Sequence, residues 1–284
     1  MADDDLGSRT FLITGANTGI GKETARALAG RGARVYIACR SEPAGRAAID
    51  EIATATGNRR LELLSLDLGD LDSVRRCADG FLATGDPLHA LINNAGVAGS
   101  RGMTASGFER MFGTNHVGPF LLTSLLLDRL LASAPARIVN VASIAHYDAL
   151  GIDWNAVRRP THTLTGMREY SVSKLANVLH AQEQARRLEG TGVTTYALHP
   201  GVIASDIWRR VPWPVRPLMT RRMETPAHGA RTSLYCATSE KVAGDSGRYY
   251  DDCRRTEPSA VATAGLGAEL WRRSVEWTGQ PVSA

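Results

Sequence analysis

The sequence predicts an α/β protein with a doubly wound parallel sheet, formed as a single domain over residues 1–284. Three observations lead to this prediction. Short apolar runs alternate with longer amphipathic segments, a glycine-rich turn follows the first apolar run, and no repeat or low-complexity linker interrupts the alternation. Such β–α alternation implies a parallel sheet with helices on both faces. Right-handed crossovers then place ligands at the carboxyl ends of the strands.

The individual elements follow from this alternation. Short runs rich in Val, Ile and Leu are typical of strands that helices cover on both sides. The expected strands are Phe11–Thr14, Arg34–Cys39, Leu61–Leu66, Leu88–Asn93, Arg137–Ala142, Val193–Leu198 and Arg248–Tyr250. The segments between them place apolar residues at helical spacing. The expected helices are Ile20–Ala29, Ala44–Thr54, Leu71–Phe81, Phe108–Leu131, Tyr170–Leu188 and Ala227–Ala237.

Two segments, 146–168 and 202–225, are too long for ordinary connections. Long loops in compact domains are usually functional or disordered, and both of these follow strand ends on the predicted ligand side. We expect them to supply an apolar pocket suited to a bulky lipophilic substrate. The residues expected to line it are Ile144, Trp154, Val202, Ile207, Trp208, Val211, Trp213, Leu218 and Met219.

Composition excludes several classes of function. Hydrophobic residues make up 43% of the chain, enough for a substantial core, and the net charge is only +4. No dense basic run or nucleic-acid motif is present, so we expect no nucleic-acid partner. The longest apolar run, 119–131, is interrupted by Asp128 and Arg129 and is too short to span a bilayer, so we expect no membrane span.

Cysteine usage and the N-terminus predict a reduced, cytoplasmic protein. The 4 cysteines form no C-x-x-C pair, the 7 histidines form no H-E-x-x-H pattern, and we expect no metal. The acidic N-terminus, Met-Ala-Asp-Asp-Asp, resembles neither a signal peptide nor a transit peptide.

The glycine-rich turn is a candidate cofactor site. Gly15, Gly19 and Gly21 stand between the first expected strand and the first helix. A tight turn there favours residues without Cβ, and amide groups at a helix start can bind a pyrophosphate. The spacing is G-x-x-x-G-x-G, and an ordinary strand–helix connection is the alternative. Its place after the first strand favours a dinucleotide site.

Tyr170 and Lys174 form a candidate acid–base pair. Positions i and i+4 of a helix share one face, and an ammonium beside a phenol lowers the phenol pKa from about 10 toward neutrality. Tyr170 would then serve as a general acid or base. The alternatives are a tyrosine at the edge of the core and a solvated lysine. Lys174 is one of only three lysines in an arginine-rich chain, which favours a role that needs a compact ammonium.

Several motifs together resemble the short-chain dehydrogenase/reductase family. They occur in the family's order, and the resemblance extends from Arg9 to about Val275. The motifs are Thr14-Gly-x-x-x-Gly-Ile-Gly21, Asn93-Asn94-Ala95-Gly96, Ser143, Tyr170-x-x-x-Lys174 and Pro200-Gly201. Further segments are most similar to the retinol-dehydrogenase branch, namely Ala38–Ser41, Ser171–Asn177, Leu198–Val202 and Gly229–Tyr235.

The resemblance implies a Rossmann-type fold, a nicotinamide cofactor and a catalytic tetrad of Asn115, Ser143, Tyr170 and Lys174. Ser143 would hydrogen-bond the substrate oxygen, although its distance from Tyr170 along the chain is longer than in many members. Asn115 would hold a water in a proton relay; a helix-kinking or capping asparagine is the alternative. The implied cofactor contacts are Gly15, Asn17, Thr18, Gly19, Ile20, Gly21, Arg40, Ser41, Asp67, Leu68, Asn93, Ala95, Gly96, Tyr170, Lys174, Pro200, Gly201 and Ile203.

Some of these contacts have stated roles. The resemblance implies that Asp67 and Leu68 touch the adenine. Asn93 would contact the adenine ribose or brace the central strand, and the two roles are nearly equal in weight. Pro200, Gly201 and Ile203 would line the nicotinamide.

Arg40 predicts the type of cofactor. Enzymes of this fold that use NAD place an acidic residue at the end of the second strand, whereas an arginine there accommodates the 2′-phosphate of NADP. Cys39 occupies the acidic position, and Arg40 follows it. A guanidinium matches phosphate geometry. Arg40 as one more surface arginine is the alternative, and the missing acid is the stronger part of the argument.

These observations predict an NADP(H)-dependent oxidoreductase that interconverts a carbonyl and an alcohol on a lipophilic small-molecule substrate, with reduction favoured. A non-catalytic NADP(H)-binding regulator is one alternative, and a lyase or epimerase that reuses the tetrad is another. The sequence leaves open the substrate, the stereochemistry and the formation of a homo-oligomer.

Overall fold

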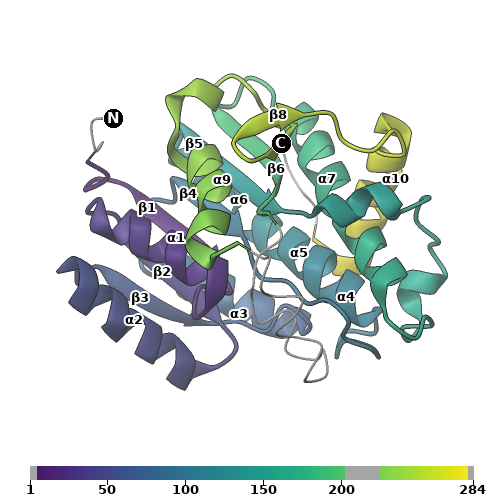
Figure 1. Cartoon of the computed structure of the whole chain (residues 1–284), viewed down its shortest axis with the longest axis horizontal. Coiled ribbons are helices and arrows are strands. Elements are labelled where there is room, and N and C mark those ends of the chain that lie inside the picture. The colour runs from purple at the N-terminus through teal and green to yellow at the C-terminus, as the bar shows by residue number, and fades with distance from the viewer. Residues whose placement is uncertain (1–4, 202–223, 281–284) are drawn as a thin grey trace.

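A computed structural model describes residues 5–201 and 224–280. Its centre is an 8-stranded sheet in the order β3-β2-β1-β4-β5-β6-β7-β8 (Figure 1). Neighbouring strands from β3 to β7 are parallel, and β8 runs antiparallel to β7 at the edge. The chain therefore winds outward in both directions from β1 and β4, which confirms the predicted doubly wound, Rossmann-type fold.

All seven predicted strands are present, with ends shifted by a residue or two. Their bounds are β1 (Thr10–Thr14), β2 (Arg34–Cys39), β3 (Leu61–Ser65), β4 (Ala90–Asn93), β5 (Ala136–Val141), β6 (Val193–His199) and β7 (Arg248–Asp251). Every residue of the central strands β1 and β4 is buried. Helices on both sides of the sheet explain why these runs are apolar throughout instead of alternating.

Three helices cover one face of the sheet. They are α1 (Gly19–Gly30), α2 (Glu42–Thr56) and α9 (Pro226–Thr238). Figure 1 shows them in front of the sheet, with α1 and α2 over β1, β2 and β3, and α9 over β4, β5 and β6. Ile13 of β1, Ile37 of β2 and Leu28 of α1 lie in the core between these helices and the sheet, with no exposed surface. The helix starts point to the carboxyl edge of the sheet, because each helix follows a parallel strand.

The other face carries α3 (Leu71–Leu82), α5 (Gly118–Leu125), α6 (Leu127–Ala132) and α7 (Met167–Arg187). The last helix, α10 (Ala264–Thr278), packs against α7 at the right of Figure 1. Trp271 of α10 meets Phe120 of α5 with 5.1 Å between ring centroids. The strand β8 (Arg254–Thr256) and α10 were not among the predicted elements.

The predicted helix Phe108–Leu131 is present as a helical segment, but it is not one regular α-helix. The chain instead forms α4 (Arg110–Phe112), a π-helical turn η1 (Gly113–Val117), and then α5 and α6. A Cβ on Gly118 would lie 2.3 Å from the carbonyl oxygen of Leu68, so only glycine allows this approach. Turns of this kind often occur at functional sites.

The structure describes the first of the two long segments in full and only the last two residues of the second. Segment 146–168 begins within the 3₁₀ turn η2 (Ile144–Asp148) and contains a second short turn, η3 (Ala156–Arg158). Of the segment 202–225, residues 202–223 lie outside the described residues. The pocket residues predicted from Val202 to Met219 therefore lie outside them too.

Candidate active site

The glycine-rich turn is built as its composition predicts. Gly15 and Gly19 adopt positive φ angles of 67° and 56°, which residues with a side chain rarely adopt. A Cβ on Gly21 would lie 2.5 Å from Nδ2 of Asn94 and 2.6 Å from the carbonyl oxygen of Gly15. The first turn of α1 contains no acidic residue. Its amide groups therefore keep the positive potential that favours a pyrophosphate.

The turn is tied to the end of β4. Nδ2 of Asn94 donates to the Thr14 carbonyl at 2.8 Å, and the amide of Ala95 donates to Oγ1 of Thr14 at 3.0 Å. Gly96 follows at the centre of the site. A Cβ there would stand 3.4 Å from both Oδ1 of Asn115 and Nζ of Lys174. The absence of a side chain on Gly96 therefore leaves the approach to these two residues open.

Tyr170 and Ser143 share a hydrogen bond, although 26 residues separate them in sequence. Burial raises the pKa of Tyr170, and the hydrogen bond with Ser143 opposes this rise. Ser143 caps η2, where its Oγ accepts from the amide of Ala145 at 3.2 Å. That bond holds the hydroxyl at the carboxyl end of β5, beside the phenol.

Lys174 does not act on Tyr170 as the sequence predicts. Its Nζ lies 5.6 Å from the centroid of the phenol ring and donates to the carbonyl of Val141 at 2.8 Å. The pKa of Tyr170 is raised, not lowered, because desolvation dominates at this distance. Burial also lowers the pKa of Lys174 to about 8. The expected shift of the phenol toward neutrality is therefore wrong for the structure described.

Asn115 lies in the π-helical turn and is 1% exposed. Its Oδ1 accepts from the Val97 amide at 2.8 Å, and its Nδ2 donates to the Val97 carbonyl at 3.0 Å and to Oγ of Ser173 at 2.9 Å. Oγ of Ser173 in turn donates to the Tyr170 carbonyl at 2.7 Å. Asn115 is thereby fixed against the loop after β4 and against the helix that carries Tyr170.

Sequence reasoning missed two residues that join these parts. Ser173 links Asn115 to α7, and Asn177 donates through Nδ2 to the Val141 carbonyl at 3.2 Å, the same oxygen that Lys174 contacts. Both lie on the face of α7 that carries Tyr170 and Lys174. Their spacing from Tyr170 was the available signal, but small polar residues on helices are too common to single out from sequence.

The end of β2 presents one exposed cation. Cys39 is buried at 4% exposure, whereas the side chain of Arg40 is 79% exposed. The only ion pair of Arg40 in the described part of the chain is a long one, 3.9 Å from NH1 to Oδ2 of Asp67. Ser41 caps α2 through its Oγ. Arg40 is therefore available to a second anion at this edge.

Several other predicted cofactor contacts are hydrogen-bonded or buried within the protein. Nδ2 of Asn93 donates to Thr123 and Asn140, both at 3.0 Å, so its amide braces β4 against α5 and β5. Oδ1 of Asp67 accepts from the Gly69 amide at 2.9 Å. Leu68 is buried beneath Gly118. The remaining predicted positions Asn17, Thr18, Ile20, Pro200 and Gly201 lie in the glycine-rich turn and after β6, while Ile203 lies outside the described residues.

The two predicted pocket residues that the structure describes, Ile144 and Trp154, lie in different environments. Ile144, beside Ser143, is 50% exposed. Trp154 instead packs against Trp277 of α10, with 6.2 Å between ring centroids, and under the guanidinium of Arg273. Trp154 therefore belongs to the core around α10.

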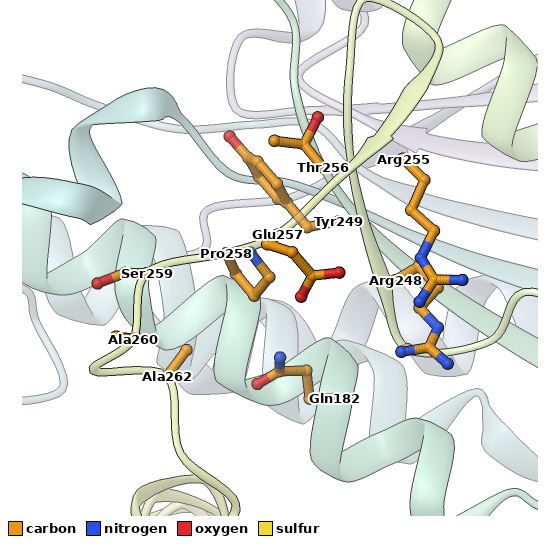
Figure 2. Close-up of a pocket in the computed structure, with 11 residues that line it drawn as sticks. Gln182, Arg248, Tyr249, Arg255, Thr256, Glu257, Pro258, Ser259, Ala260 and Ala262 are labelled. Carbon is orange, nitrogen blue, oxygen red and sulfur yellow. The ribbon is translucent and has the colours of Figure 1, made fainter.

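A cavity of about 250 Å³ lies beside β7 and β8 and contains none of the tetrad. Figure 2 shows Gln182 of α7 below Glu257 and Pro258, with Arg248 and Arg255 at one side. Among the described residues, no group of three His, Cys, Asp or Glu side chains could hold a metal ion. Within the same residues, no helix has the length and apolar character needed to cross a membrane.

Comparison with known proteins identifies the family. A family model described as short chain dehydrogenase matches residues 9–154. Human retinol dehydrogenase 12 is 49% identical over 96% of this chain and 87% of its own length. Human dehydrogenase/reductase SDR family member 13 is 44% identical over 97% of this chain and 74% of its own length. The chain belongs to the short-chain dehydrogenase/reductase family.

Within the family, the similarity to retinol dehydrogenases places the chain in the retinol-dehydrogenase-like branch. Human retinol dehydrogenase 11 is 46% identical over 98% of this chain and 88% of its own length. This confirms the resemblance seen in the sequence motifs. Membership establishes the protein as an oxidoreductase with a nicotinamide cofactor.

Solved structures share the fold over nearly the whole chain. An uncharacterized protein from Mycobacterium paratuberculosis matches with a TM-score of 0.79 and 34% identity, covering 100% of this chain and 99% of that one. The Pseudomonas aeruginosa RhlG/NADP active-site complex matches with a TM-score of 0.69 and 25% identity, covering 93% of this chain and 100% of that one.

Proposed function

We propose that the protein is an NADP(H)-dependent reductase of ketones or aldehydes on lipophilic molecules, with Asn115, Ser143, Tyr170 and Lys174 as its catalytic tetrad. The observation that carries the proposal is the set of contacts among these residues: Asn115 and Lys174 flank Gly96, Tyr170 is hydrogen-bonded with Ser143, and Asn115 is linked to the helix of Tyr170 through Ser173. These contacts support an acid–base site at the carboxyl edge of the sheet.

Tyr170 is the proton donor in this proposal. A bound nicotinamide would supply the hydride, and Tyr170 would protonate the oxygen of the carbonyl as it becomes an alcohol. Because burial raises the pKa of Tyr170, the phenol stays protonated at neutral pH, which suits a general acid. Ser143 hydrogen-bonds the phenol and is near enough to share the substrate oxygen. This supports reduction as the favoured direction.

Lys174 and Asn115 hold the site around that step. The Lys174 ammonium is buried at 3% exposure and is anchored to the Val141 carbonyl. It lies beside the opening at Gly96, where it can hold ribose hydroxyls. Asn115 links the loop after β4 to α7 and so fixes the position of Lys174 and Tyr170 relative to that loop. A water held near Asn115 would complete a proton relay.

Arg40 and the missing acid support NADP(H) over NAD(H). Oδ2 of Asp67, at 3.9 Å, is a weak competitor for the Arg40 guanidinium. The structural neighbour from Pseudomonas aeruginosa is an NADP complex. Both observations favour a 2′-phosphate site at the end of β2, with Ser41 as a second donor.

The names of the relatives and the exposed apolar residues together suggest the substrate class. Several relatives are retinol dehydrogenases, whose substrate is a long apolar alcohol. Beside Ser143, the side chain of Ile144 is 50% exposed, and the side chain of Tyr147 is 41% exposed. An apolar rim of this kind favours a bulky lipophilic aldehyde or ketone over a small polar one.

The direct test is NADPH oxidation, followed by absorbance, with a panel of retinoid, steroid and short-chain carbonyls. Tyr170→Phe keeps the ring and removes the proton donor, so kcat should fall about 10²- to 10⁴-fold while NADPH still binds. Tyr235→Phe is the matched control, because Tyr235 packs on the opposite face near α1. NADPH binding without turnover on any carbonyl would favour a regulator, and product formation without NADPH oxidation would favour a lyase or epimerase.

A further inference from the structure

The turn that follows Ser143 is held by two histidines and not only by its own backbone. The carbonyl of Ser143 accepts from the His146 amide at 3.1 Å and from His146 Nδ1 at 2.7 Å. The amide of Ile144 donates to Nδ1 of His199, at the end of β6, at 3.3 Å. His146 has no exposed surface. The serine is therefore clamped on both sides.

The partners of His146 define its protonation. A carbonyl can only accept, so Nδ1 must carry the proton that it shares with Ser143. The amide of Ser259 donates to Nε2 of His146 at 3.1 Å, so Nε2 must be unprotonated. Only the neutral Nδ1–H form of the imidazole satisfies both bonds. One ring thus joins the Ser143 turn to the segment after β8.

A second bond joins the same two segments. The hydroxyl of Tyr147 donates to the Glu257 carbonyl at 2.5 Å. The ring of His146 lies 4.0 Å from the ring of Tyr147 and 4.7 Å from that of Tyr249 on β7, measured between centroids. Figure 2 shows Tyr249, Glu257 and Ser259 along the wall of the cavity beside β8. Hydrogen bonds and ring contacts therefore link the edge of the sheet, at β7 and the segment after β8, to the turn that follows Ser143.

From these contacts we infer that His146 is a positioning residue of the reductase: it sets the orientation of Ser143 and, through Ser143, of the Tyr170 phenol. The inference rests on the proposed function, because it assigns Ser143 to the reaction. His146 itself touches neither Tyr170 nor Lys174 in any described contact. Its effect is transmitted through the Ser143 carbonyl, whose direction fixes the backbone that carries the Ser143 hydroxyl.

The experiment separates the two bonds with three variants of His146. In His146→Asn the side-chain amide can take the place of Nδ1 and donate to Ser143. In His146→Gln the longer side chain can accept from Ser259 but no longer reaches Ser143 in the same way. His146→Leu loses both bonds. The matched control is His89→Leu, because Nδ1 of His89 also accepts a backbone amide, from Thr10 at 3.0 Å, at the opposite edge of the sheet.

The expected readout is a split between kcat and KM. Since a displacement of about 1 Å in a catalytic group can cost about 10²-fold, His146→Leu should lower kcat about 10- to 100-fold and leave KM for NADPH within about twofold. His146→Asn should recover most of kcat, and His146→Gln should remain close to His146→Leu. Equal kcat in all three variants and the wild type, or an equal loss in His89→Leu, would overturn the inference.

Amide hydrogen exchange gives a readout that does not depend on activity. Exchange at residues 144–146 should be about tenfold faster in His146→Leu and His146→Gln than in the wild type, and unchanged in His146→Asn and His89→Leu. Unchanged exchange in His146→Leu would refute the clamp. An inactive wild type with the expected exchange pattern would count against the proposed function alone. If His146→Leu does not fold, the contrast between His146→Asn and His146→Gln carries the test.

Discussion

The buried histidine His180 predicts a measurable sensitivity of the fold to acid. His180 lies on α7, 4% exposed, with Phe120 at 5.3 Å and Trp271 of α10 at 5.8 Å between ring centroids. Its Nε2 has no hydrogen-bond partner among the described residues. Burial lowers the pKa of His180 to about 4. The imidazole must therefore be neutral where α7 and α10 meet.

The magnitude follows from proton linkage. A histidine in an unfolded chain has a pKa of about 6.5. Because the folded pKa is depressed, the unfolded state binds more protons below about pH 6.5, so stability is complete above that pH and falls as pH drops toward about 4. Between about pH 8 and pH 5, this one group should cost about 2 kcal/mol of the free energy of unfolding. His116, 5.7 Å away, adds a loss of the same sign.

The perturbation is His180→Leu, measured by urea unfolding at both pH values with tryptophan fluorescence. Leucine has a similar volume and no proton to gain, so the variant should lose about 2 kcal/mol less than the wild type between about pH 8 and pH 5. His162→Gln, at an exposed position, is the control and should leave the pH dependence unchanged. The same loss in wild type and His180→Leu would refute the argument that acid acts on the neutral His180.

Three further predictions concern the cofactor and the proton. We expect wild-type kcat/KM to decline above about pH 8, where Lys174 loses its charge. Lys174→Met should remove this decline and weaken NADPH binding; an unchanged profile and affinity would exclude Lys174. Arg40→Ala should reduce the preference for NADPH over NADH about tenfold, the lower end for a charge-assisted bond because Arg40 is exposed, whereas Arg46→Ala should not. Gly21→Ala should abolish dinucleotide binding in a fluorescence titration, since its Cβ would meet the backbone carbonyl oxygen of Gly15, within the glycine-rich turn, at 2.6 Å; retained affinity would contradict this.

The sequence by itself determined the seven parallel strands of the sheet and the motifs along its edge. Strands such as β1 and β4 could be predicted because burial on both faces requires runs that are apolar throughout, and this signal is local. The turn at Gly15 and Gly19 could be predicted for a similar reason, since its positive φ angles require glycine whatever surrounds it. The order of the motifs along the chain was enough to indicate the family.

Only the tertiary structure decided what depends on contacts between distant residues. The π-helical turn within the predicted helix Phe108–Leu131 accompanies the bonds of Asn115 to Val97 and Ser173, 18 and 58 residues away. The pKa of Tyr170 is another case, because the burial that raises it is created by the fold, whereas the spacing to Lys174 is visible in the sequence. Helical spacing places two side chains on one face, but desolvation and hydrogen-bond partners, which are set by packing, decide which of them carries the charge.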